Sequence, residues 1–178
     1  MRTAAMTFSG LGFFVTAGLA LLGGCSSTRT ATPQPIAQAS DIDGLVGGTW
    51  VGSLTYLDYT SKKPYTMPST LTVERVAGSA SSWTFRLGYP DEPHANREEL
   101  VVLSEQGRVF DGEAVVERAT LPGGGVRVVT ETDGEDDRRP ARIRHLYLVG
   151  RSSFSIQKLV RFSGEAEFIE RNTYRWAR

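Results

Sequence analysis

The sequence predicts an all-β protein whose antiparallel strands close into an up-and-down β-barrel. From Gly48 onward, short runs rich in Val, Thr, Tyr, Phe, Trp and Ile, the residue types that half-buried strands prefer, alternate with turn residues. No stretch keeps a 3.6-residue periodicity beyond one or two turns, and the connections are too short for parallel crossovers. An antiparallel meander of about 8–10 strands most simply hides its edges by closing into a barrel.

Residues 1–24 have the features of a signal peptide. Arg2 is the only charge, and the apolar stretch after it is broken by glycines and ends in Leu21-Leu22-Gly23-Gly24. A bilayer-spanning helix needs ~20 mostly apolar residues, so this stretch is too short and too interrupted to be one. The leucine and small residues before Cys25 resemble the lipobox of bacterial lipoproteins, in which the cysteine is lipidated and becomes the new N-terminus.

The lipobox resemblance implies where the protein resides. It implies cleavage before Cys25 and a membrane anchor in which a diacylglycerol, with palmitate-type acyl chains, is linked to the Cys25 sulfur by a thioether. Ser26 resembles the sorting pattern of outer-membrane lipoproteins, which implies an anchored protein of the cell envelope that faces the periplasm. Cys25 is the only cysteine of the chain, so no disulfide within the chain is expected.

After the cysteine, residues 25–44 are rich in Ser, Thr, Ala, Pro and Gln and carry few large apolar groups. Such a segment cannot offset its ordering entropy by burial, so we expect a flexible linker. The barrel domain is then expected over residues 45–178, a length that suits one domain.

The expected strands follow one another through the rest of the chain. Gln106-Gly107, Asp111-Gly112, Pro122–Gly125, Gly150-Arg151 and Ser163-Gly164 supply turns, and the charged segment 133–137 suits an exposed hairpin tip. The strands are expected at 49–59, 69–77, 82–89, 99–105, 108–119 with an interruption, 125–132, 141–149, 152–161 and 165–176.

Tight turns in the last three strands allow a register to be predicted. A turn at Gly150-Arg151 places Tyr147 opposite Phe154, and a turn at Ser163-Gly164 places Ile156 opposite Arg171. The interior face is then expected to carry Ile143, His145, Tyr147, Phe154, Ile156, Val160, Ile169 and Arg171, with Tyr174 on the outer face.

Gly48-Thr49-Trp50 resembles the G-x-W that opens the first strand of lipocalin-like barrels and also opens avidin-like and other calycin-type barrels. In lipocalins the tryptophan plugs the closed end, and an arginine of the last strand packs across it. The resemblance implies these barrel-closing roles for Trp50 and for either Arg171 or Arg175. The chain also looks like bacterial secreted proteins that begin with Gly-Thr-Trp and end with Glu-Arg-Asn-x-Tyr-x-Trp, here Glu170 to Trp176.

Motifs for catalysis, metals and nucleic acids are absent from the sequence. Charges balance at 20 basic and 20 acidic residues, so no positive field captures nucleic acid. His94 lies in a loop-like segment and His145 in a strand, and no nucleophile elbow accompanies them. Gly123–Gly125 precede a strand and not a helix, which excludes a phosphate loop. We therefore expect no enzyme and no metal or cofactor.

Three functions compete. A barrel of this size can hold one small apolar or amphipathic ligand. Its pocket would be lined by Trp50, Phe85, His145, Tyr147 and Phe154, with Arg171 as a partner for an acidic headgroup. Alternatively, loops 60–68 and 90–98 bind a protein partner, such as a hydrolase that the barrel inhibits. The third alternative is a structural component of the envelope.

Overall fold

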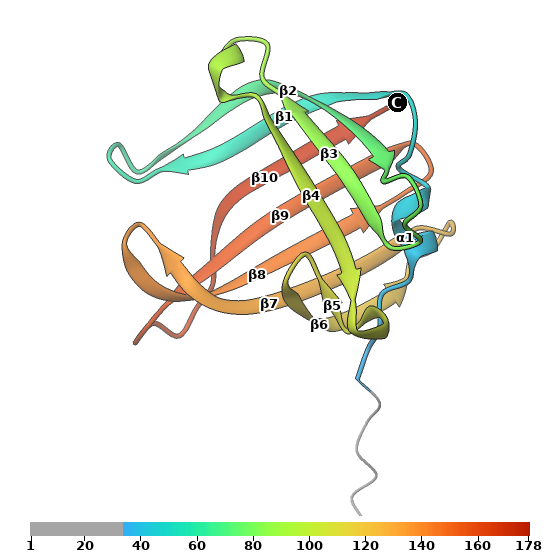
Figure 1. Ribbon diagram of the computed structural model, residues 1–178. Helices are drawn as coiled ribbons and strands as arrows, with labels where there is room; N and C mark the ends of the chain where they lie inside the picture. The colour runs from blue at the N-terminus through green and yellow to red at the C-terminus, as the bar shows by residue number, and fades with distance from the viewer. Residues whose placement is uncertain (1–33) are drawn as a thin grey trace, which may run out of the picture. The chain divides into compact units, whose positions relative to one another are not determined.

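The computed structural model describes residues 34–178, which form a closed up-and-down barrel of ten antiparallel strands (Figure 1). Each strand pairs with the next one in the chain, and β10 returns to pair with β1. The predicted fold class is confirmed. The strands are β1 (Thr49–Asp58), β2 (Lys63–Arg75), β3 (Ser82–Gly88), β4 (Arg97–Ser104), β5 (Val109–Phe110), β6 (Glu113–Thr120), β7 (Val126–Asp136), β8 (Arg139–Val149), β9 (Ser153–Phe162) and β10 (Ile169–Ala177).

Several strands are longer than the sequence predicted. The expected exposed tip at 133–137 continues β7, because Asp133 lies opposite Arg142 and Asp136 opposite Arg139, and such pairs of opposite charge support a ladder. β2 already begins at Lys63, so most of the expected loop 60–68 is strand. The expected loop 90–98 contains a short 3-10 helix, Pro93–Ala95, and ends where β4 begins at Arg97. The expected interruption of run 108–119 is found at Asp111-Gly112, between β5 and β6.

The predicted register of the last strands is wrong by two residues. Tyr147 lies opposite Ile156, not Phe154, because the β8–β9 connection is longer than a two-residue turn. An even shift leaves the faces unchanged, so Tyr147 and Phe154 are buried on the inside as expected. A bulge at Arg171 then reverses the alternation of β10, and Tyr174, expected outside, lies opposite Ile156 and is buried.

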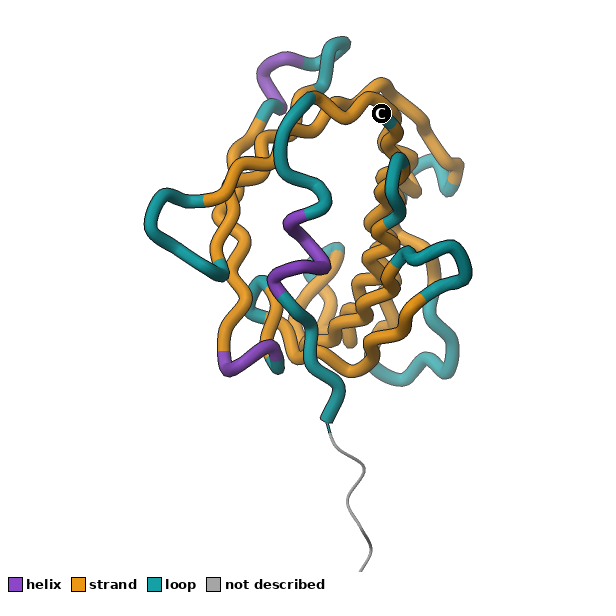
Figure 2. Tube along the Cα trace, turned by 90° about the vertical axis from the view of Figure 1, so that its right-hand side faces the viewer, coloured by secondary structure: helices purple, strands orange, loops and turns teal. Residues whose placement is uncertain are grey.

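The segment before β1 closes one end of the barrel. Figure 2 shows its short helix α1 (Ala39–Asp43) lying across the ring of strands. Ala37, Ile42 and Leu45 are buried in the main core. The expected linker 25–44 is therefore wrong in its C-terminal part, since Ala37 and Ile42 pack in the core of the barrel.

Two carboxylates fix α1 to the barrel. Asp41, almost fully buried, pairs with Arg118 of β6 at 2.7 Å, and a second nitrogen of that guanidinium bonds the other carboxylate oxygen at 2.8 Å. Asp43 pairs with Arg75 of β2 and accepts a bond of 3.1 Å from the indole nitrogen of Trp83 on β3. α1 is thus tied to opposite parts of the wall.

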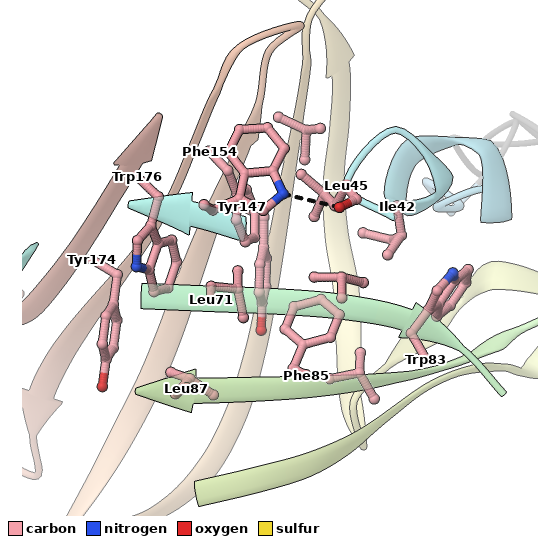
Figure 3. Packing of buried hydrophobic residues seen from close by; sticks show 14 of the residues in the cluster. Ile42, Leu45, Leu71, Trp83, Phe85, Leu87, Tyr147, Phe154, Tyr174 and Trp176 are labelled. Atoms are coloured by element: carbon pink, nitrogen blue, oxygen red, sulfur yellow. Dashed lines mark hydrogen bonds between the residues drawn. The ribbon is translucent and has the colours of Figure 1, made fainter. Parts of the chain in front are cut away.

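Trp50 lies at the end of the barrel that α1 covers. It is fully buried, and its indole nitrogen donates to the Leu45 carbonyl at 2.9 Å, the bond drawn in Figure 3. The guanidinium carbon of Arg178 lies 4.2 Å from the centre of the Trp50 ring, and its nitrogens donate to the carbonyls of Gly47 and Gly44. The expectation that Arg171 or Arg175 packs across Trp50 is therefore wrong.

The β1–β10 register explains why Arg178, and neither Arg171 nor Arg175, packs on Trp50. Val51 lies opposite Ala177, so the chain position opposite Trp50 is the next residue, Arg178. Arg175 lies opposite Ser53 and is exposed. Arg171 lies at the β10 bulge, near the other end of the barrel.

Candidate functional site

The barrel contains a cavity of about 680 Å³ whose lining comes mainly from β3, β4, β8, β9 and β10 and includes neither Trp50 nor a residue of α1. Cross-strand pairing explains its wall on β4. Val101, Glu99 and Arg97 lie opposite Trp83, Phe85 and Leu87 of β3, so these alternate residues of β4 face inward. The apolar part of the lining consists of Phe85, Leu87, Val101, Phe110, Tyr147 and Ile156.

The cavity borders a break in the wall. β4 pairs with β5 only through Leu103 and Ser104, and β6 first pairs with β7 at Ala114 opposite Glu131. Among the described residues, 97–101 of β4 therefore pair only with β3, and 132–136 of β7 pair only with β8. The other edge of each segment has no strand partner. The gap between these two segments makes the interior of the barrel accessible.

Aromatic rings form much of the apolar lining. Phe110 and Tyr147 meet edge to face, with ring centres 5.0 Å apart. Phe85, labelled with Tyr147 in Figure 3, meets Phe154 at 6.4 Å. Phe154 itself lies behind this lining and stacks on Trp176 at 5.5 Å. These well-packed rings give the cavity a fixed apolar surface.

Three polar side chains form a bonded group on the lining. His145 Nδ1 lies 2.8 Å from Glu113 Oε2, and the same oxygen accepts a hydrogen bond from the Thr130 hydroxyl. Thr130 is fully buried, and its place opposite His145 in the β7–β8 register brings the two together. Burial and the charge of Glu113 raise the pKa of the nearby Tyr147 well above its usual value, which keeps the phenol protonated.

A second group of polar side chains is centred on Arg97 of β4. Arg97 pairs with Glu99 at 2.6 Å and donates to the Tyr174 hydroxyl at 3.1 Å. That hydroxyl also shares a hydrogen bond of 2.8 Å with Tyr89. Burial raises the pKa of Tyr89, and the hydrogen bond to Tyr174 adds to the effect. The Tyr89 hydroxyl is therefore neutral at physiological pH.

Asp111 lies between these groups, in the turn from β5 to β6, with a left-handed backbone (φ +50°) that aspartate tolerates. Burial raises the pKa of its carboxyl, and the charges of Glu99 and Glu113 raise it further, while His145 opposes them. Within residues 34–178, no cation forms an ion pair with Asp111, in contrast to Glu99, which pairs with Arg97.

The basic side chains at the far end of the barrel are held by one carboxylate. Asp136 accepts hydrogen bonds from Lys158 at 2.7 Å and from the Tyr59 hydroxyl at 2.5 Å, and Arg171 lies 3.4 Å away. Arg171 also donates to the Leu57 carbonyl and lies 4.1 Å over the Tyr59 ring. Arg171 is thus part of a structural network, and it does not line the cavity as expected.

The structure brings together three of the residues predicted for a pocket. Phe85, His145 and Tyr147 line the cavity, whereas Phe154 and Trp50 belong to the packed core. Asp111, Lys158 and the inward residues of β4 also line the cavity and were not predicted from the sequence. Lys158 lies two residues after Ile156 on β9, so the alternation of side chains along a strand predicts that both face inward. β4 begins with charged residues on both of its faces, so the sequence does not show which of them face inward.

The remaining predictions concern the lipid anchor, membrane spans and metal sites. Cys25, its lipidation and the signal peptide lie outside the described residues. Among residues 34–178, no helix is long and apolar enough to cross a bilayer. In that same part of the chain, no three His, Cys, Asp or Glu side chains gather as a metal site would require.

No protein-family model matches the chain, and no curated protein matches it either.

Proposed function

We propose that this barrel binds one small amphipathic molecule in its cavity. The observation that carries the proposal is the cavity itself, about 680 Å³ in volume, which lies within the range of about 300–1,000 Å³ typical of small-molecule sites. A protein that served only as a structural element would gain stability by filling such a space with side chains.

The distribution of the lining supports an amphipathic ligand in particular. Phe85, Phe110 and Tyr147 offer rigid apolar surface for the body of a ligand. The bonded groups around Glu113 and Glu99 offer polar partners on the sides of the same space. Sites of this kind use few polar groups to orient a ligand and apolar area to hold it.

The test is binding of a neutral amphipathic probe, 1-naphthalenemethanol, to the full chain carrying Cys25→Ala, purified without detergent. We expect saturable binding, followed by the change in tryptophan fluorescence. Ile156→Trp, on the cavity lining, should abolish it by filling the space. Leu148→Trp, at a residue 39% exposed on the outer face of the adjacent strand, is the matched control and should bind normally. Equal binding by both variants would place the probe outside the cavity and refute the proposal.

We also propose that the chain works as a lipoprotein, anchored through Cys25 at the outer membrane and facing the periplasm. The support is the sequence Leu21-Leu22-Gly23-Gly24-Cys25 with Ser26 after it. Acyl chains contribute ~0.8 kcal/mol for each buried methylene, so two or more of them hold a protein stably at a membrane. Anchoring would place the cavity in the periplasm.

Replacement of Cys25 by alanine tests the anchor. Cells grown with labelled palmitate should label the wild-type chain, which should sediment with membranes. The Cys25→Ala chain should carry no label and leave the outer-membrane fraction. Ser27→Ala serves as the control, because it alters the same segment without touching the thiol. Palmitate label on the Cys25→Ala chain would contradict the proposal.

A further inference from the structure

The charges around the cavity are not balanced. Besides two tyrosines, six charged or titratable side chains line it: Arg97, Glu99, Asp111, Glu113, His145 and Lys158. The three carboxyl groups outnumber the two Lys and Arg side chains. A ligand that enters this space therefore meets a lining with an excess of negative charge.

Both cations of the lining are already engaged. Arg97 pairs with Glu99 at 2.6 Å and donates to the Tyr174 hydroxyl. Lys158 donates to Asp136 at 2.7 Å, and the carboxylate of Asp136 is almost buried, with 9% of its surface exposed. An anionic headgroup would have to break one of these ion pairs. Among the described residues, the lining therefore has no unpaired Lys or Arg side chain for an anion.

Within residues 34–178, two carboxylates of the lining, Glu113 and Asp111, form no ion pair with a Lys or Arg side chain. Oε2 of Glu113 accepts a hydrogen bond from the Thr130 hydroxyl and lies 2.8 Å from His145 Nδ1. Asp111 is an exposed residue that lines the same cavity as Glu113 and Glu99, and it lies two residues before Glu113 in the chain. A bound cation would relieve the repulsion among these groups.

From this charge balance we propose that the ligand is a monocation, an amine with an aromatic or other apolar body. The inference rests on the proposed function and names its ligand class. The ammonium would lie between Asp111 and Glu113, where N–H donors meet two carboxylates. The body would lie against Phe110 and Tyr147, whose ring faces also attract cations.

Three probes of the same shape test the inference: 1-naphthalenemethylamine, 1-naphthalenemethanol and 1-naphthoate. They are titrated against the Cys25→Ala chain at neutral pH, where the amine is protonated. We expect the amine to bind about tenfold or more tightly than the alcohol, because a charge-assisted hydrogen bond contributes about 1.4 kcal/mol or more. The carboxylate should bind least.

Asp111→Asn should remove about tenfold of the amine's affinity and lower the alcohol's affinity much less, and circular dichroism shows whether the variant is folded. Asparagine tolerates the left-handed backbone at this position. Glu98→Gln is the matched control, since Glu98 lies on the outer face of β4 with its side chain 60% exposed. This control should leave the amine's affinity unchanged.

The outcomes separate the inference from the proposed function. Tighter binding of the amine that is lost in Asp111→Asn alone supports the inference. Equal or tighter binding of the alcohol or the naphthoate overturns it and leaves a ligand-binding barrel of another class. If none of the three probes binds, the proposed function itself fails, and the inference with it.

Discussion

At the scale of single residues, Trp50 connects the sequence motif to the fold. Gly48-Thr49-Trp50 predicted a plug at one end, and the structure places the ring there, fully buried. The arginine across it could not be predicted from position alone. Its identity depends on the β1–β10 register and on the bulge at Arg171, and both are set by contacts far apart in the chain.

Trp50→Ala should lower the free energy of unfolding by about 3–5 kcal/mol, because it leaves a large void and frees the Leu45 carbonyl. Arg178→Ala should cost about 0.5–1 kcal/mol, since its stacking on the ring is exposed. Urea unfolding followed by circular dichroism measures both. Near-wild-type stability of the alanine variant at Trp50 would show that the ring does not seal the core.

At the scale of elements, the strands were predictable and the closing segment was not. Alternation and turn residues marked every strand apart from its ends. Residues 34–44 contain only two large aliphatic side chains, Ile36 and Ile42, and Ile36 is exposed, so the segment has too few buried apolar residues to give a periodic signal. What holds α1 is the pairing of Asp41 with Arg118, 77 residues away, which no local pattern reveals.

The hairpin of β7 and β8 provides a second test through Asp136. Burial alone would raise the pKa of this carboxyl, but hydrogen bonds from Lys158 and Tyr59 and the charge of Arg171 lower it below the ordinary 3.8. Asp136→Asn should therefore cost about 1–3 kcal/mol at neutral pH. A carboxyl with a depressed pKa in the folded state stabilises above its unfolded pKa. The difference between wild type and variant should thus persist above pH 3.8 and shrink as the pH falls below it.

Asp133→Asn is the control for this effect. Asp133 lies on the same strand and pairs with Arg142, but 84% of its side chain is exposed. Its loss should change stability by less than about 1 kcal/mol at any pH. Thermal unfolding of the three proteins across acidic and neutral pH makes the comparison. A pH-independent difference for Asp136→Asn would refute the assigned ion pair.

At the scale of the whole molecule, the closed barrel followed from the number of short strands and the lack of helices. The cavity could not be predicted in this way, because its lining combines residues from seven strands and includes charged groups on an inward face. Glu99 and Arg97 look like surface residues in sequence, and only pairing with Phe85 and Leu87 turns them inward. Hydrophobic patterning finds packed interiors more readily than polar ones.

The central claim is that this barrel holds a small molecule in its cavity, and native mass spectrometry tests it most directly. The Cys25→Ala chain and its Ile156→Trp derivative would be purified from cells without detergent and compared. We predict a discrete additional mass on the first protein, released on denaturation, and none on the second. The same mass on both proteins, or the mass of the chain alone on both, would contradict the account.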